Sequence, residues 1–330
     1  MTRAAPAAVL LTLLSACTAQ PPLRELLPAD AAPSVELSAT PFFAQDEYQC
    51  GPAALAMVLA AAGVAVIPDE LVPQVYLPAR QGSLQPELLG AARRHGRVPY
   101  TLAPDPSAFL AELAAGRPVL LLQNLGTRQF QGWHYAVLVG YDAAADRAIL
   151  RSGTTERLVM PWPRFQATSG RAEHWAVVVA RPGEVPATAQ PRTWIAAVAA
   201  LEGAGQPDAA RLAYEAGLDR WPSEPLLWFG RGNAAYATGD LLTAVESFHR
   251  AAGLAPANAA VRHNLAQALL AAGCPHAALD EARAASAQTP GAALADAIEA
   301  LVGRAGAATA DAAEDPPQCA SPAAGSGPGP

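Results

Sequence analysis

One cysteine of the sequence stands where its thiol could act as a nucleophile. Cys50 is followed by Gly51 and Pro52 and then by an apolar run that extends to residue 62. Proline is tolerated in the first turn of a helix, since its missing N–H would have no intrahelical partner there, so the segment predicts a helix over residues 50–62. Unpaired N–H groups and the positive end of such a helix stabilise a thiolate. We therefore expect the Cys50 thiol to have a lowered pKa and to be nucleophilic.

A cysteine nucleophile also needs a base and a donor that stabilises the oxyanion before acyl transfer can occur. His134 and His174 each stand at the start of an apolar run of strand-like composition, and either could be the base. Gln45 and Gln49 precede Cys50 and carry amide donors. Each residue also has a structural interpretation, since a lone cysteine is commonly buried, a histidine can begin a strand and a glutamine can lie in a turn.

The elements that would hold these residues lie in the first half of the chain. Helices are expected at residues 50–62, 84–94 and 106–115, and strands at residues 119–122, 134–141, 148–151, 158–160 and 175–179. The expected strands are short, rich in β-branched residues and separated by Gly, Asp or Pro, which is typical of antiparallel strands. Helices followed by strands indicate an α+β domain, which we place at residues 36–182, with a proline-rich linker at residues 183–190.

The residues around the cysteine and the first histidine resemble a known family. The pattern is Gln45-x(4)-Cys50-Gly-Pro-Ala-Ala-Leu-Ala-Met-Val-Leu with a later His134-Tyr-Ala-Val-Leu-Val-Gly-Tyr-Asp. It resembles the papain-like cysteine peptidases that trim double-glycine leaders from bacteriocins, and their stand-alone relatives, over roughly residues 38–182. The resemblance implies a papain-like fold and a peptide or protein substrate. It also implies that Cys50 is the nucleophile, His134 the general base and Gln45 the oxyanion donor.

The sequence departs from the family pattern at two positions. Gln45 precedes Cys50 by five residues rather than the usual six, so Gln49 stays open as an alternative donor. The family places an Asp or Asn that orients the histidine at the end of the following strand, where this chain has Ser152. A serine can accept from the imidazole N–H but cannot offset the charge of an imidazolium as a carboxylate does. A catalytically weak or inactive binding protein with a peptidase-like fold is therefore the alternative function.

The second half of the chain repeats itself every 34 residues. Three sets of residues keep this spacing, namely Pro222, Pro256 and Pro290, then Gly205, Gly239 and Gly273, then Ala210, Ala244 and Ala278. A period of 34 residues with a glycine at the central turn and a proline at the end resembles the tetratricopeptide repeat. We expect an all-α solenoid over residues 191–302 whose concave face binds a peptide or a partner protein. Residues 303–330, rich in Pro, Gly and Ala, are expected to be a disordered tail.

The first residues have the layout of an export signal. Arg3 precedes an apolar stretch too short to span a bilayer, and the stretch ends in Leu14-Ser15-Ala16-Cys17, which resembles the bacterial lipoprotein box. We expect residues 1–16 to be removed, Cys17 to carry acyl chains, and residues 17–35 to form a spacer to the first domain. The absence of Asp at position 18 favours the outer membrane, with the protein facing the periplasm. An ordinary secretory signal with an incidental cysteine is the alternative.

The composition sets limits on the remaining classes of function. The 330 residues are 52% hydrophobic and 15% charged, which indicates a globular protein. All 22 cationic residues are arginines, the net charge is −7 and no basic tract occurs, so we expect no nucleic-acid binding. No metal-binding or nucleotide-binding motif is present, and we expect no cofactor. Cys274 and Cys319 could pair with each other, which the sequence leaves open.

Overall fold

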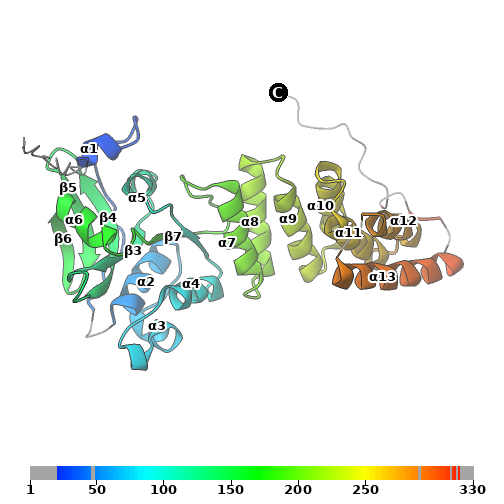
Figure 1. The fold of residues 1–330 in the computed structure, drawn as a ribbon, viewed down its shortest axis with the longest axis horizontal. Helices are drawn as coiled ribbons and strands as arrows, with labels where there is room; N and C mark the ends of the chain where they lie inside the picture. Colours follow the sequence, from blue (N-terminus) through cyan, green and yellow to red (C-terminus); the bar gives the residue numbers. More distant parts are fainter. Residues whose placement is uncertain (1–20, 46–48, 289–290, 313, 317–318, 320–330) are drawn as a thin grey trace, which may run out of the picture.

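The computed structural model describes residues 21–45, 49–288, 291–312, 314–316 and 319. A sheet domain lies at one end of the long axis, and a row of helices extends away from it (Figure 1). The expected signal segment, residues 1–16, and the expected lipidation site, Cys17, lie outside the described residues. In the part of the chain that the structure describes, no helix is both long and apolar enough to cross a bilayer.

In the described part of the sheet domain, seven antiparallel strands form one sheet in the order β2-β7-β3-β4-β5-β6, with β1 beside β4. The strands are β1 (Ser34–Glu36), β2 (Val98–Thr101), β3 (Val119–Asn124), β4 (Trp133–Asp142), β5 (Arg147–Ser152), β6 (Thr155–Pro161) and β7 (Ala176–Ala180). All six residues of β3 and all five of β7 are buried, because helices cover both faces of the sheet. This architecture confirms the predicted α+β fold.

Within the described residues, six helices accompany the sheet. They are α1 (Leu23–Leu26), α2 (Cys50–Ala61), α3 (Pro68–Val75), α4 (Gln85–Arg94), α5 (Pro106–Ala114) and α6 (Trp162–Gly170), with a 3-10 turn, η1 (Pro78–Arg80), before α4. Helices α2, α3 and α4 pack on one face of the sheet, and α5 and α6 pack on the other. Helix α2 is buried on nearly every side, from Gly51 to Leu59, which explains why its sequence is apolar all round rather than amphipathic.

The prediction of a spacer at residues 17–35 is wrong for the described residues 21–35, which pack on the sheet domain. Leu23 is fully buried, and its backbone N–H donates to Asp146 Oδ1 at 3.0 Å. Val35 in β1 pairs with Tyr141 in β4. The proline-rich and alanine-rich composition gave no sign of this packing, because one buried leucine and a three-residue edge strand are enough to fasten the segment.

The second part of the chain, as far as the structure describes it, forms seven helices, each packed on the next. They are α7 (Pro191–Glu202), α8 (Pro207–Arg220), α9 (Pro225–Thr238), α10 (Leu241–Leu254), α11 (Ala259–Ala271), α12 (Pro275–Ser286) and α13 (Ala292–Asp311). Gly205, Gly239 and Gly273 all have φ between 77° and 83°, at the turn between paired helices. A left-handed residue is needed there to end the first helix, and glycine adopts it without strain. The 34-residue period therefore marks the helix pairs that the sequence predicted.

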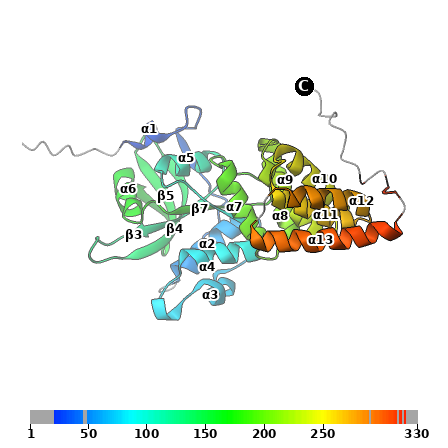
Figure 2. The same ribbon diagram turned by 45° about the vertical axis from the view of Figure 1, so that its right-hand side comes forward.

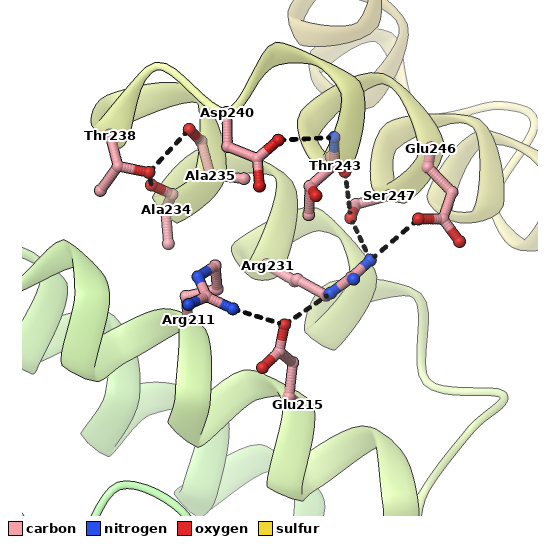
Figure 3. Close-up of polar contacts among 10 residues, drawn as sticks. All are labelled: Arg211, Glu215, Arg231, Ala234, Ala235, Thr238, Asp240, Thr243, Glu246 and Ser247. Carbon is pink, nitrogen blue, oxygen red and sulfur yellow. Dashed lines mark hydrogen bonds and ion pairs between the residues drawn. The ribbon is translucent and has the colours of Figure 1, made fainter.

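Polar side chains join three neighbouring helices of this solenoid (Figure 3). Arg231 of α9 binds Glu215 of α8 at 3.2 Å, and it reaches Ser247 at 2.8 Å and Glu246 at 3.5 Å on α10. Because Arg231 is largely buried between the helices, its hydrogen bonds fix the spacing of α8 and α10 as well as contributing charge attraction.

The expected linker at residues 183–190 packs against the sheet domain. Thr188 donates from its backbone N–H and its hydroxyl to Glu112, each at 2.7 Å, and the Gln190 N–H donates to the Tyr100 hydroxyl at 3.1 Å. Trp194 of α7 continues the core of the sheet domain beside Tyr100. The two parts therefore share one hydrophobic core, and α7 lies between the sheet and the other helices (Figure 2).

The prediction of a disordered tail from residue 303 is wrong for residues 303–311. Helix α13 continues to Asp311, and Leu301 and Ala305 are buried against the solenoid. Beyond the helix, Cys319 forms a disulfide with Cys274 at the start of α12. Asp315 accepts hydrogen bonds from the backbone N–H groups of His276 at 3.2 Å and Ala277 at 2.7 Å, and so caps α12 from a distant part of the chain.

We predict that reduction of the Cys274–Cys319 disulfide destabilises the end of the solenoid. The bond closes a loop of 45 residues, and the loss of that constraint on the unfolded chain corresponds to about 3–4 kcal/mol. Thermal unfolding with and without reductant measures the change. A chain carrying Cys274→Ala and Cys319→Ala is the control, and it should not respond to reductant. An unchanged unfolding curve for the native chain would contradict the prediction.

Candidate active site

The site is built at the N-terminus of α2, where the helix begins at Cys50 as the sequence predicted. A cavity of about 820 Å³ opens there. Its walls come from the N-terminus of α2, the turn at residues 80–85 and the start of β4. Cys50, His134 and Gln45 all line this cavity. Residues more than 80 positions apart in the sequence are thus brought to one place by the packing of α2 against the sheet.

The sulfur of Cys50 is more strongly desolvated than its position in the helix suggests. Burial raises the pKa of the Cys50 thiol, although the backbone N–H groups of Tyr135 and Gly51 act in the opposite direction. The predicted lowering of this pKa is therefore wrong. The physical reason is that α2 is the central buried helix, so its first residue loses more hydration than the amides at the helix end can replace.

His134 is the second residue of β4 and contacts the end of the neighbouring strand. Its Nε2 lies 2.9 Å from the Ser152 hydroxyl oxygen, so Ser152 occupies the place that the resemblance gives to the orienting residue. Burial lowers the pKa of His134. Among the described residues, no hydrogen bond joins the Cys50 sulfur to the His134 ring, and no carboxylate contacts that ring. Both pKa shifts favour a neutral thiol beside a neutral imidazole.

Gln45 is fastened to the strands that carry the histidine and the serine. Its backbone N–H donates to the Gly153 carbonyl at 3.1 Å, and its side-chain Nε2 lies 3.5 Å from the Tyr135 carbonyl. Gly153 also lines the cavity, whereas Gln49 is not part of the cavity wall. Of the two glutamines that the sequence offered as oxyanion donors, the structure places Gln45 at the cavity.

The second histidine lies elsewhere. His174 has a positive φ of 51°, and its Nδ1 is 3.1 Å from the Ser169 hydroxyl oxygen. Its ring packs edge-on against Phe109 in the helical layer on the other face of the sheet. His174 does not line the cavity and takes a structural position in the described fold.

Sequence reasoning did not find two contributors to the site. Arg151, which is only 4% exposed, donates to the carbonyls of Ser38 and Thr40, each at 3.4 Å, and to that of Glu156 at 2.6 Å. It thereby fixes the segment that leads to Gln45, and its only signal in the sequence is a charge within an apolar strand. The other contributor is the turn at residues 80–85, which has no motif.

Metal chemistry has no visible support at this site. Within the described ranges, no group of three or more His, Cys, Asp or Glu side chains is arranged to hold a metal ion. The arrangement of thiol, imidazole and amide instead suits nucleophilic attack on a carbonyl.

Comparison with known proteins finds matches to two separate parts of the chain. Residues 37–157 match the Peptidase_C39 like family, and residues 191–234 match the tetratricopeptide repeat. The chain therefore contains a C39-like domain followed by a tetratricopeptide region. No curated protein matches the chain.

Two solved structures show similarity to separate parts of the chain. One is described as a C39-like peptidase from Bacillus anthracis, with 19% identity and a TM-score of 0.38, and the match covers 45% of this chain and 98% of that one. The other is the first TPR of Spaghetti (RPAP3) bound to the HSP90 peptide SRMEEVD, with 16% identity and a TM-score of 0.35, covering 37% of this chain and 94% of that one.

We predict that Cys50 reacts with iodoacetamide only as the solution becomes alkaline. Because burial raises its pKa, the thiolate forms at higher pH than in a free thiol, and the alkylation rate should reach its midpoint above that of N-acetylcysteine measured in parallel. The Cys50→Ala chain corrects for other thiols. A midpoint below that of the free thiol would instead support the original expectation of a thiolate stabilised by the helix.

We also predict that Ser152→Asp raises the pKa of His134. A carboxylate 3–4 Å from the ring would stabilise the imidazolium, and a shift of about one to three units is expected. NMR titration of the His134 ring protons measures the shift, with Ser152→Ala as the control that adds no charge. An unchanged pKa in Ser152→Asp would show that position 152 does not control the ring.

Proposed function

We propose that this protein is a cysteine peptidase that hydrolyses peptide bonds through Cys50 and His134. The observation that carries the proposal is the single cavity in which a thiol, an imidazole and a side-chain amide meet. The C39-like domain supports the class of reaction. Peptide hydrolysis of this kind needs a nucleophile, a proton acceptor and an oxyanion donor, and the cavity contains a candidate group for each.

The reaction starts from neutral groups. As the Cys50 sulfur attacks the peptide carbonyl, His134 takes the thiol proton, and the carbonyl oxygen becomes an oxyanion. The Cys50 backbone N–H and the Gln45 amide stabilise that oxyanion. His134 then gives its proton to the leaving amine, and the C–N bond breaks to form a thioester. Water activated by His134 hydrolyses the thioester and restores the thiol.

Ser152 holds the imidazole during these proton transfers. Because Nε2 is hydrogen-bonded to the serine hydroxyl, Nδ1 is the ring nitrogen that exchanges the proton with Cys50. Since a serine adds no negative charge, the imidazolium is less stable than it would be beside a carboxylate. This arrangement fits a reaction in which proton transfer accompanies attack rather than one that begins from a stable ion pair.

The same observation favours the second candidate function. A domain with a neutral dyad and no carboxylate beside the described histidine could bind peptides without turnover. In that case the protein would be a peptidase-like scaffold of the cell envelope. The tetratricopeptide region would then supply its partners.

We place the protein outside the cytoplasm, tethered through acyl chains on Cys17 to a membrane that faces the periplasm, most simply the outer membrane. The lipoprotein-like segment before Cys17 supports this location. The Cys274–Cys319 disulfide is of a kind that persists in oxidising compartments. The tetratricopeptide region would bind the substrate or a partner protein on its concave face.

We predict that cleavage of a peptide library by the full chain depends on the three residues of the cavity. Cys50→Ala should abolish cleavage, His134→Ala should reduce kcat at least about a hundredfold, and Gln45→Ala should reduce it by about a hundredfold or more. His174→Ala is the matched histidine control and should retain most of the activity if it folds. Mass spectrometry of the products measures the cleavage.

The outcomes separate the two functions. Cleavage that disappears in Cys50→Ala establishes the enzyme, whereas peptide binding without products in the native chain establishes the scaffold. Equal losses in His134→Ala and His174→Ala would show that the base has been assigned to the wrong histidine.

A further inference from the structure

Several large apolar side chains of the sheet domain are exposed, and some of them line the cavity. In the described sheet domain, the exposed large hydrophobic residues are Ile67, Leu84, Leu125, Phe130, Trp133 and Val159. Two of them, Leu84 and Trp133, line the cavity itself. Leu125 and Phe130 lie in the loop that joins β3 to Trp133, and Phe130 is 81% exposed. We call Leu125, Phe130 and Trp133 the hairpin surface.

The loop that carries this surface is held in a fixed conformation. Asn124, which is 1% exposed, accepts hydrogen bonds from the N–H groups of Gly126 and Gly132, each at 3.0 Å, and donates to the Thr127 carbonyl at 3.1 Å. The Thr127 hydroxyl oxygen accepts from the Phe130 N–H at 3.0 Å. The buried amide of Asn124 therefore holds the loop in the conformation that exposes the Phe130 ring to solvent.

The core side of the loop is anchored as well. Arg171, after α6, donates to the Asn124 carbonyl through two nitrogens at 2.8 and 3.1 Å. At Gly126 a Cβ atom would lie against the Phe130 carbonyl, so only glycine permits this close turn. A loop that is ordered in this way can bind a ligand without first losing much conformational entropy.

One residue of the hairpin surface, Trp133, belongs to the cavity that contains Cys50. Trp133 pairs with Asn124 at the end of the β3–β4 ladder, precedes His134 and lines the cavity. Leu84 gives the turn at residues 80–85 an apolar side chain in the same cavity. Trp133 is therefore the residue at which the hairpin surface reaches the cavity wall.

We infer that the hairpin surface binds a large apolar side chain of an extended peptide substrate, next to the peptide bond that Cys50 attacks. This inference rests on the proposed function and adds the substrate class to it. A peptide fits better than a membrane because two of the exposed apolar residues, Trp133 and Leu84, line the cavity itself and are not confined to the tip of the loop. The contact with Phe130 would strengthen substrate binding without contributing to bond cleavage.

The test uses the full chain with Cys17→Ser, so that no acyl chain can be attached there. Two fluorogenic peptides are derived from a library peptide that binds the Cys50→Ala chain, and they differ only in having Leu or Ser at one position. For the leucine peptide, Phe130→Ser should raise KM about tenfold or more with kcat little changed, because burial of apolar surface on the ring is lost. For the serine peptide, the two chains should behave alike.

Ile67→Ser is the matched control, since Ile67 is 50% exposed and lies outside the cavity wall. It should leave both peptides unaffected. Unchanged kinetics of Phe130→Ser on both peptides would overturn the inference and leave the proposed function intact. Fluorescence anisotropy of the leucine peptide with Cys50→Ala tests binding separately from turnover. Phe130-dependent binding without cleavage by the native chain would overturn the proposed function and retain the surface.

A membrane is the competing ligand of the hairpin surface. Vesicles of phosphatidylethanolamine and phosphatidylglycerol test it directly in a sedimentation assay with the Cys17→Ser chain. Sedimentation that is lost in Phe130→Ser, together with unchanged peptide kinetics, would assign the surface to a membrane and overturn the inference. No sedimentation, together with the KM change for the leucine peptide, supports the peptide.

Discussion

The packing of α2 against the sheet is the constraint on which the rest of the site depends. Leu55, Met57 and Leu59 are fully buried. Burial of each such side chain stabilises the folded state by about 1.5–3 kcal/mol. Because the helix is enclosed on nearly every side, its first residue is held against the start of β4. The same enclosure that positions the Cys50 sulfur also removes its hydration. Position and reactivity of the thiol are therefore consequences of one packing arrangement.

Desolvation also determines the character of the histidine. Burial lowers the pKa of His134, and its described neighbour on Nε2 is a hydroxyl rather than a carboxylate. In such surroundings, proton transfer from the thiol to the imidazole is less favourable than at a site where a third charge stabilises the thiolate and the imidazolium. The fold compensates by fixing the groups around them, since buried Arg151 holds the segment before Gln45 through three carbonyls. The site relies on position more than on charge.

The solenoid packs directly on the sheet domain through α7. Tyr100 and Trp194 belong to one core, and buried Glu112 accepts two hydrogen bonds from Thr188 in the connecting segment. At the other end, the Cys274–Cys319 disulfide and the cap provided by Asp315 return the chain to α12. A ligand bound to the solenoid would thus be held at a fixed orientation to the sheet domain.

The sequence by itself determined the α+β fold, the start of α2, the 34-residue helix pairs and the residue types at the cavity. These follow from local rules: Pro52 is allowed in a first helical turn, alternating apolar runs form strands, and Gly205, Gly239 and Gly273 provide left-handed turns. Only the tertiary structure decided that His134 rather than His174 faces the cavity, that the Cys50 pKa is raised, and that residues 183–190 and 303–311 are ordered. These properties depend on burial and on contacts between distant segments, which composition and spacing do not contain.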